Sequence, residues 1–208
     1  MNRSAEVVIV PTGTANLASI TAGLERAGAR VRPARDAEDV LASDRVVLPG
    51  VGSFAPARER LAGDGLDSAL IRRVESGAPL LAICLGLQLL THGSDESPGV
   101  PGLGVIPGTV SRFPASVQVP QLGWNRIATD PACRILEPGY AYFANSYRLE
   151  SVPEQWRAAR ADHGGEFVAA LEKGSLLACQ FHPELSGEWG TALLQRWLDA
   201  GPQGGASC

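Results

Sequence analysis

One segment of this chain, Pro79–Leu90, constrains its fold more than any other, because it changes from strand to helix chemistry around a single cysteine. The residues from Leu80 to Ile83 are all apolar, as in a buried strand, and they lead directly into Cys84. Gly86 allows a sharp turn behind this cysteine, and the leucines after it resume at helical spacing. The segment therefore predicts a strand, a tight turn and a helix, with Cys84 at the corner.

The position of Cys84 suits a nucleophile. At the first turn of a helix, the partial positive charge of the helix favours the thiolate, which is the reactive form of the side chain. The backbone N–H of Leu85 has no partner inside the helix, so it can donate to an oxyanion that forms on an attacked carbonyl. Free cysteines are also among the most buried residues in proteins, so this segment alone leaves a core cysteine equally open.

A second pattern lies near the end of the chain, at Leu176–Phe181. These residues predict a buried strand, which His182, Pro183 and Glu184 follow. We expect the proline to keep the chain extended, so that the histidine and glutamate side chains leave it on the same side. A cysteine nucleophile needs an imidazole to take its proton and a third group to orient that imidazole. A polar loop explains any lone His-x-Glu, but the two segments together favour a Cys84, His182 and Glu184 triad.

The pattern along the whole chain predicts an α/β fold. Apolar strand patterns alternate with helical patterns in the first half: strands at Val7–Val10, Arg45–Leu48 and Leu80–Ile83, and helices at 17–27, 54–61 and 66–74. Such alternation indicates a mostly parallel central sheet with helices on both faces and a site at the carboxyl ends of the strands. After a loop expected at 92–107, the second half is strand-rich and closes with a helix at 187–198. We expect a single domain over residues 1–200 and a disordered tail at 201–208.

Composition and charge narrow the classes of partner. The net charge of −4 and the pI of about 5.4 give no electrostatic reason to expect nucleic acid or an anionic membrane. No apolar run approaches the roughly 20 residues of a membrane-spanning helix, and the first residues lack the pattern of a signal peptide, so the expected compartment is the cytoplasm. The four cysteines show no paired spacing and are expected to be reduced. Cys179 and His182 form a Cys-x-x-His, but without a second cluster we expect no metal site.

On these motifs the chain resembles the class I (triad-type) glutamine amidotransferases, which carry a Cys-Leu-Gly-x-Gln elbow and a distal Phe-His-Pro-Glu. Both motifs occur here in that order, at Cys84–Gln88 and Phe181–Glu184. Within that family the chain is most similar to the glutaminase subunit of imidazole glycerol phosphate synthase, called HisH, which feeds ammonia to a (β/α)8-barrel cyclase in histidine biosynthesis. Four further segments carry this closer resemblance: Gly13–Ser19, Leu48–Phe54, Val119–Asn125 and Tyr142–Tyr147.

The resemblance implies a flavodoxin-like amidotransferase fold and a cysteine-dependent glutaminase that needs no cofactor. The expected reaction hydrolyses L-glutamine to L-glutamate and ammonia through a γ-glutamyl thioester on Cys84, and the ammonia passes to a barrel cyclase held as the second subunit of a heterodimer. The backbone N–H groups of Val51 and Leu85 are then the expected oxyanion donors. The residues expected to bind glutamine are Gly50, Gly52, Gln88, Ser146 and Tyr147.

The chain also departs from the family pattern, at positions outside the triad. Pro11–Asn16 stands where the family has Asp-Tyr-Gly-x-Gly-Asn, Gln121 and Asn145 each replace a histidine, and Leu185 replaces a lysine that faces the cyclase. We expect several of these positions at the partner-facing surface. The residues expected there are Asn16, Gln121, Trp124, Asn125 and Leu185.

The departures leave other functions open beside the histidine-pathway subunit. One is a divergent paralogue that serves a specialised amidotransfer pathway with its own synthase. A second is a γ-glutamyl hydrolase that uses the same triad without a partner. A third is a catalytically silent binding subunit, which the intact Cys84, His182 and Glu184 disfavour.

Overall fold

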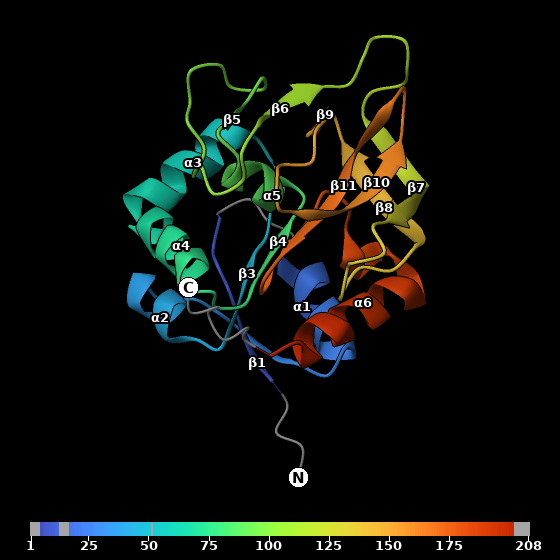
Figure 1. The fold of residues 1–208 in the computed structure, drawn as a ribbon. Coiled ribbons are helices and arrows are strands. Elements are labelled where there is room, and N and C mark those ends of the chain that lie inside the picture. The colour runs from blue at the N-terminus through green and yellow to red at the C-terminus, as the bar shows by residue number, and fades with distance from the viewer. Residues whose placement is uncertain (1–4, 13–16, 51, 202–208) are drawn as a thin grey trace.

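The computed structural model describes residues 5–12, 17–50 and 52–201. In this part of the chain a nine-stranded mixed sheet runs through the centre, and helices lie on both of its faces (Figure 1). The strand order is β2-β1-β3-β4-β12-β11-β10-β7-β8. The predicted α/β fold with a strand-rich second half is confirmed.

The two halves of the sheet differ in direction. The parallel half holds β2 (Arg30–Pro33), β1 (Glu6–Ile9), β3 (Arg45–Leu48), β4 (Leu80–Ile83) and β12 (Leu176–Cys179). The antiparallel half holds β11 (Glu166–Lys173), β10 (Arg157–Asp162), β7 (Gln121–Thr129) and β8 (Gly139–Asn145). A small sheet holds β5 (Gly93–Ser94), β6 (Thr109–Arg112) and β9 (Tyr147–Arg148). The segment 92–107, expected to be a loop, is irregular apart from β5.

Helices cover the parallel half on both sides. α1 (Leu17–Arg26) and α6 (Gly187–Asp199) pack on one face. α2 (Ala37–Ala42), α3 (Phe54–Gly63), α4 (Leu66–Glu75) and α5 (Leu85–Leu90) pack on the other face. In the described ranges no helix has the length and apolar character needed to cross a membrane.

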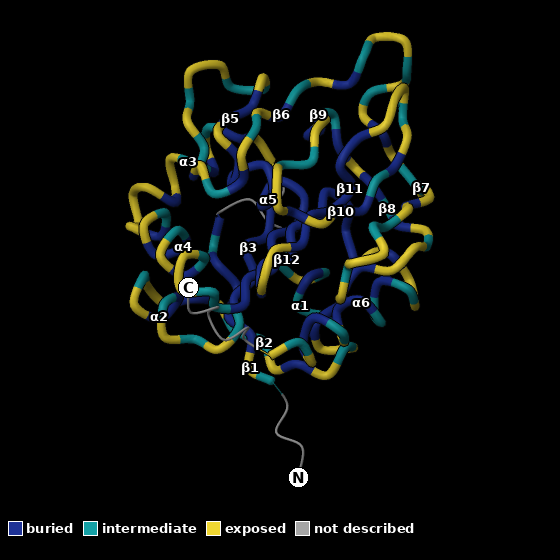
Figure 2. The backbone as a smooth tube through the Cα atoms, in the orientation of Figure 1, coloured by how far each residue is buried: buried dark blue, intermediate teal, exposed yellow. Residues whose placement is uncertain are grey.

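The pleat of β4 divides the core between the two faces. Leu81 and Ile83 pack on the side of α1 and α6, whereas Leu80 and Ala82 pack on the side of α3 and α4. All four side chains are buried, and the central strands are buried along their length (Figure 2). A strand that is apolar at every position is therefore the sequence signature of this sheet's centre.

Candidate active site

Cys84 stands alone between β4 and α5, at a sharp corner of the backbone. Its φ of 53° and ψ of −110° lie on the left-handed side, which residues with a Cβ rarely adopt. The adjoining strand and helix hold it there, since the Cys84 N–H donates to the Cys179 carbonyl at 2.7 Å and its own carbonyl accepts from Leu87 N at 3.0 Å. The predicted strand, turn and helix around Cys84 are confirmed.

Two glycines let this corner pack against the end of β3. A Cβ on Gly86 would collide with the carbonyl oxygen of Leu48, and a Cβ on Gly50 would collide with Leu85 and the Gly86 nitrogen. Gly50 was expected in the glutamine pocket. It packs against the cysteine corner instead, and it does not line the cavity beside Cys84 that is described below. Its effect is to bring the β3 end close to Leu85.

Neighbouring parallel strands bring the two distant motifs together. β4 and β12 pair in register, with Ile83 opposite Cys179, so both chains leave the sheet at the same edge. His182 follows β12 by three residues and is tied to β8 by its N–H, which donates to Tyr142 O at 2.9 Å. The side chains of His182 and Cys84 line the same cavity. The sheet order thus supplies a contact that no local pattern contains.

His182 and Glu184 meet through a turn and not along an extended chain as predicted. Pro183–Leu185 forms a 3₁₀ turn, in which Leu185 N donates to His182 O at 3.1 Å. Proline suits the first position of such a turn, because its fixed φ is helical and its missing N–H has no partner there. The turn brings His182 Nδ1 to 2.9 Å from Glu184 Oε1, with both side chains buried. The expected contact exists, but its backbone geometry was wrongly predicted.

The surroundings of His182 favour its protonated form. Burial by itself lowers the pKa of this imidazole, but the neighbouring Cys84 and Glu184 side chains raise it, and the net effect raises the pKa to about 10. The Glu184 backbone is fixed in turn, since its carbonyl accepts from Arg26 Nη2 at 3.1 Å. Its Oε2 is buried and has no hydrogen-bond partner in the described chain. This arrangement can hold a proton beside a cysteine thiolate.

A cavity of about 210 Å³ opens beside the Cys84 sulfur. Residues from the β3–α3 connection, the cysteine corner, the β5 loop and the end of β8 surround it. The wall consists of Gly52, Cys84, Leu85, Gln88, Glu96, Ala144, Asn145, Ser146, Tyr147 and His182. Four of the five predicted pocket residues thus line the cavity, while Val51 lies outside the described residues.

Two polar side chains at this site were not predicted from the sequence. Glu96 lines the cavity and accepts from Phe54 N at 2.9 Å; it belongs to an irregular loop that has no periodic pattern. Gln180 is fully buried, and its Nε2 lies 3.7 Å from the Cys84 sulfur. A polar residue at the end of an otherwise apolar strand was the available signal for Gln180.

The expected partner-facing positions differ in how far they are exposed. Trp124 is 58% exposed and Leu185 is 44% exposed. Asn125 is half-buried and donates to Asp162 O at 2.8 Å, and Asn16 lies outside the described residues. Gln121 was wrongly expected on the surface, because the pleat of β7 turns its side chain inward, where it is buried opposite Asn145 of β8.

Within residues 5–12, 17–50 and 52–201, no group of three or more histidine, cysteine, aspartate or glutamate side chains is arranged to hold a metal ion. Cys179 is fully buried in the core cluster beside Ile83. Cys84, Cys133 and Cys179 are free thiols.

Comparison with known proteins agrees with the geometry. The sequence pattern of the family described as "Glutamine amidotransferase class-I" matches residues 8–200. The imidazole glycerol phosphate synthase subunit HisH of Gloeobacter violaceus is 42% identical over 207 residues, which cover 96% of this chain and 91% of that protein. The chloroplastic imidazole glycerol phosphate synthase hisHF of Arabidopsis thaliana is 40% identical over 199 residues, covering 92% of this chain. The match spans 34% of that longer plant protein.

Solved structures share the fold. A structure described as "Crystal structure of glutamine amidotransferase" superposes with a TM-score of 0.76 at 22% identity, covering 93% of this chain and 97% of the other. The family pattern spans nearly all of the sequence, and the bacterial relative aligns along nearly its whole length. The chain therefore belongs to the class I glutamine amidotransferases and, among them, to the family of the HisH subunits of imidazole glycerol phosphate synthase.

Proposed function

We propose that this chain hydrolyses the side-chain amide of L-glutamine with Cys84 as nucleophile, His182 as general acid and base, and Glu184 as the group that orients the imidazole. The observation that carries the proposal is that Cys84 and His182 line the wall of one cavity, where His182 Nδ1 lies 2.9 Å from Glu184 Oε1. Each member occupies the position that its chemical step requires.

In the first half of the reaction, the Cys84 thiolate attacks the side-chain carbonyl carbon of glutamine, and a C–S bond forms. The carbonyl oxygen becomes an oxyanion, which the Leu85 N–H stabilises; this N–H donates to no other described residue. His182 gives its proton to the amide nitrogen, the C–N bond breaks, and ammonia leaves. A γ-glutamyl thioester remains on Cys84.

In the second half, water replaces ammonia. His182 takes a proton from the water as the oxygen attacks the thioester carbon, and the C–S bond then breaks. The sulfur leaves as the thiolate beside the protonated imidazole, which restores the starting state. The sum of the two halves is glutamine plus water giving glutamate plus ammonia.

The cavity supports glutamine as the substrate through its polar wall. Its volume of about 210 Å³ suits a small amino acid. Glu96 supplies a carboxylate for the α-amino group, while Gln88, Ser146 and Tyr147 supply polar contacts around it. The second oxyanion donor expected from Val51 stays a proposal on a residue outside the described ranges.

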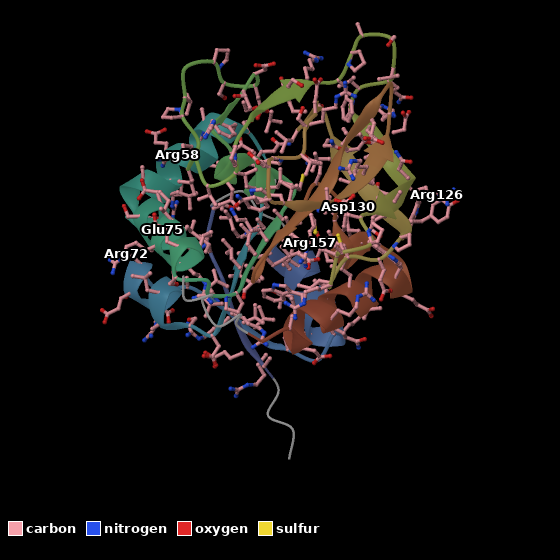
Figure 3. All side chains as sticks on the ribbon, viewed as in Figure 1. Arg58, Arg72, Glu75, Arg126, Asp130 and Arg157 are labelled. Atoms are coloured by element: carbon pink, nitrogen blue, oxygen red, sulfur yellow. The ribbon has the colours of Figure 1, made fainter. Side chains whose placement is uncertain are left out.

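We further propose that the ammonia passes to a (β/α)8-barrel cyclase docked at the exposed face of β7 and β8. Four large apolar side chains are exposed there or at the 3₁₀ turn: Leu122 at 68%, Trp124 at 58%, Tyr140 at 61% and Leu185 at 44%. Trp124 reaches to Gly187, next to that turn, so these side chains belong to one region. Arg126, which is exposed and pairs with Tyr140 in the sheet, points outward from the molecule (Figure 3). Exposed apolar surface of this kind indicates a protein partner.

The test is a glutaminase assay of the chain alone and with its cyclase, using glutamine and γ-glutamyl peptides as competing substrates. We expect glutamine to be hydrolysed, and faster with the cyclase, since docking can bias loops at the site toward the productive arrangement. Preference for γ-glutamyl peptides without any effect of the cyclase would favour a free-standing hydrolase instead.

A further inference from the structure

Gln180 lies beside the proposed nucleophile without touching the substrate cavity. It follows β12 directly, its backbone N–H donates to Ala169 O at 2.8 Å, and its side chain has no exposed surface. It does not belong to the described wall of the cavity. A fully buried amide requires hydrogen-bond partners, and the role of Gln180 can be inferred from the partners of its two amide ends.

Both ends of the Gln180 amide have partners in the site. Its Oε1 accepts from Gln88 Nε2 at 3.0 Å. Its Nε2 lies 3.7 Å from the Cys84 sulfur, within reach of a hydrogen bond to that larger atom. The amide therefore links the helix after the cysteine to the sulfur itself.

An acceptor-only group fixes the direction of this link. Gln88 Nε2 also lies 3.4 Å from the backbone carbonyl of Tyr147, which has no hydrogen to donate. The Gln88 group that faces this carbonyl must be the amino group, and Gln180 must then present its oxygen to Gln88. The amino group of Gln180 then faces Cys84, so the hydrogen-bond network fixes the orientation of the Gln180 amide.

We propose that Gln180 is a positioning residue that holds the Cys84 sulfur as a thiolate, acting as a second donor beside His182. The inference rests on the proposed role of Cys84 as nucleophile. A buried thiolate needs donors, because it has lost its hydration, and a neutral amide supplies one without competing for the proton that His182 must deliver. Gln88, expected to bind the substrate, has the additional effect of orienting Gln180.

The test is the pH dependence of Cys84 alkylation by iodoacetamide in the free protein, followed by mass spectrometry of the peptide that contains Cys84. The assay needs neither glutamine nor the cyclase. Burial raises the pKa of Cys133 to about 11 and also raises that of Cys179, so both stay as slowly reacting thiols near neutral pH. A Cys84→Ala protein identifies the remaining background.

Gln180→Met keeps the length of the side chain and removes the donor. We expect the pH midpoint of Cys84 alkylation to rise by about one half to one pH unit, which corresponds to the loss of one hydrogen bond. The matched control is Gln195→Met on the exposed side of α6, which should leave the midpoint unchanged. With glutamine and the cyclase, Gln180→Met should lower kcat and leave KM nearly unchanged, because the side chain does not line the cavity.

A second variant, Gln88→Leu, removes the group that orients Gln180 and leaves Gln180 in place, so it should raise the midpoint by a smaller amount. Midpoints equal to wild type in both variants would overturn the inference, and so would a raised KM with an unchanged kcat in Gln180→Met. Failure of the proposed function gives a different result: wild-type Cys84 itself would then react no faster than Cys133.

Discussion

Substitution of Glu184 by glutamine tests how much a buried carboxylate contributes to the proposed base. In the native protein, His182 Nδ1 lies 2.9 Å from Glu184 Oε1. The side chain of Glu184→Gln keeps an oxygen that can accept from this nitrogen, but it carries no charge. A hydrogen bond to a charged group contributes about 1.5–3 kcal/mol and a neutral one about 0.5–1.5 kcal/mol. The difference of about 1–1.5 kcal/mol predicts a decrease in kcat of about fivefold to tenfold.

The same substitution should change the pH dependence in a defined direction. Glu184 is one of the groups that raise the pKa of His182 to about 10, so its neutralisation lowers that pKa. The imidazole must carry a proton to release ammonia, and the alkaline limb of the kcat profile should therefore move to lower pH. Glu184→Ala removes the acceptor altogether and should lower kcat more than Glu184→Gln does, by about 10-fold to 150-fold relative to wild type.

Stability gives an independent readout of the same contact. The folded-state pKa of His182 lies above the ordinary value near 6.5. The protonated imidazole therefore stabilises the folded protein fully below about pH 6.5, and this contribution to the free energy of unfolding is lost as the pH rises toward 10. In urea unfolding, Glu184→Gln should therefore lose most stability near pH 6 and least near pH 10.

The control is Glu188→Gln, an exposed glutamate four residues later on α6. Glutaminase turnover is measured by coupled detection of glutamate. If Glu184→Gln left both kcat and the alkaline limb at wild-type values, another carboxylate would have to orient His182.

Three other predictions concern the nucleophile, the core and the partner. Cys84→Ala should abolish glutamine hydrolysis and leave the fold and cyclase binding intact; wild-type turnover by this variant with the cyclase would refute the mechanism. Glu172 is buried, and its carboxylate accepts from Arg134 N at 2.9 Å and from the two following N–H groups. Glu172→Ala should therefore lower the free energy of unfolding by about 3 kcal/mol. A loss of stability in urea unfolding no larger than that of the exposed Glu188→Ala would contradict this prediction. Leu185 is apolar where the resemblance places a lysine that faces the cyclase, so it cannot pair with a carboxylate there. The cognate cyclase should therefore activate turnover more than a cyclase from an unrelated histidine pathway, and equal activation by the two would contradict this.

The elements that the sequence predicted well are those in which burial and periodicity agree. β3 and β4 were predicted with the bounds that the structure has, since every residue from Val46 to Leu48 and from Leu80 to Ile83 is buried. β2 was missed because it is an edge strand, where Arg30 and Arg32 bind Glu6 and nothing demands an apolar pattern. α2 was missed because it has six residues and depends on a cap, in which the Asp36 carboxylate accepts from Asp39 N at 2.8 Å.

The site could be predicted as a set of residues but not as a geometry. Local chemistry identified Cys84 and His182, whereas their contact depends on β12 lying beside β4, which is a property of sheet order. The inward side of Gln121 depends on the phase of the β7 pleat, and polar residues on both faces of that strand conceal this phase. Glu96 reaches the cavity from an irregular loop, where no periodicity exists to read.

The place of β12 in the sheet also sets the order in which the protein can assemble. It is the last strand along the described chain, yet it fills the middle of the sheet between β4 and β11. During synthesis, the edges of β4 and β11 that face β12 therefore have no hydrogen-bond partners until residues 176–179 have been made. Unpaired strand edges favour aggregation, so the growing chain depends on rapid completion or on protection from aggregation. Because the same insertion brings His182 to Cys84, the thiol meets its base only after the sheet has closed, and an incomplete chain cannot begin to consume glutamine.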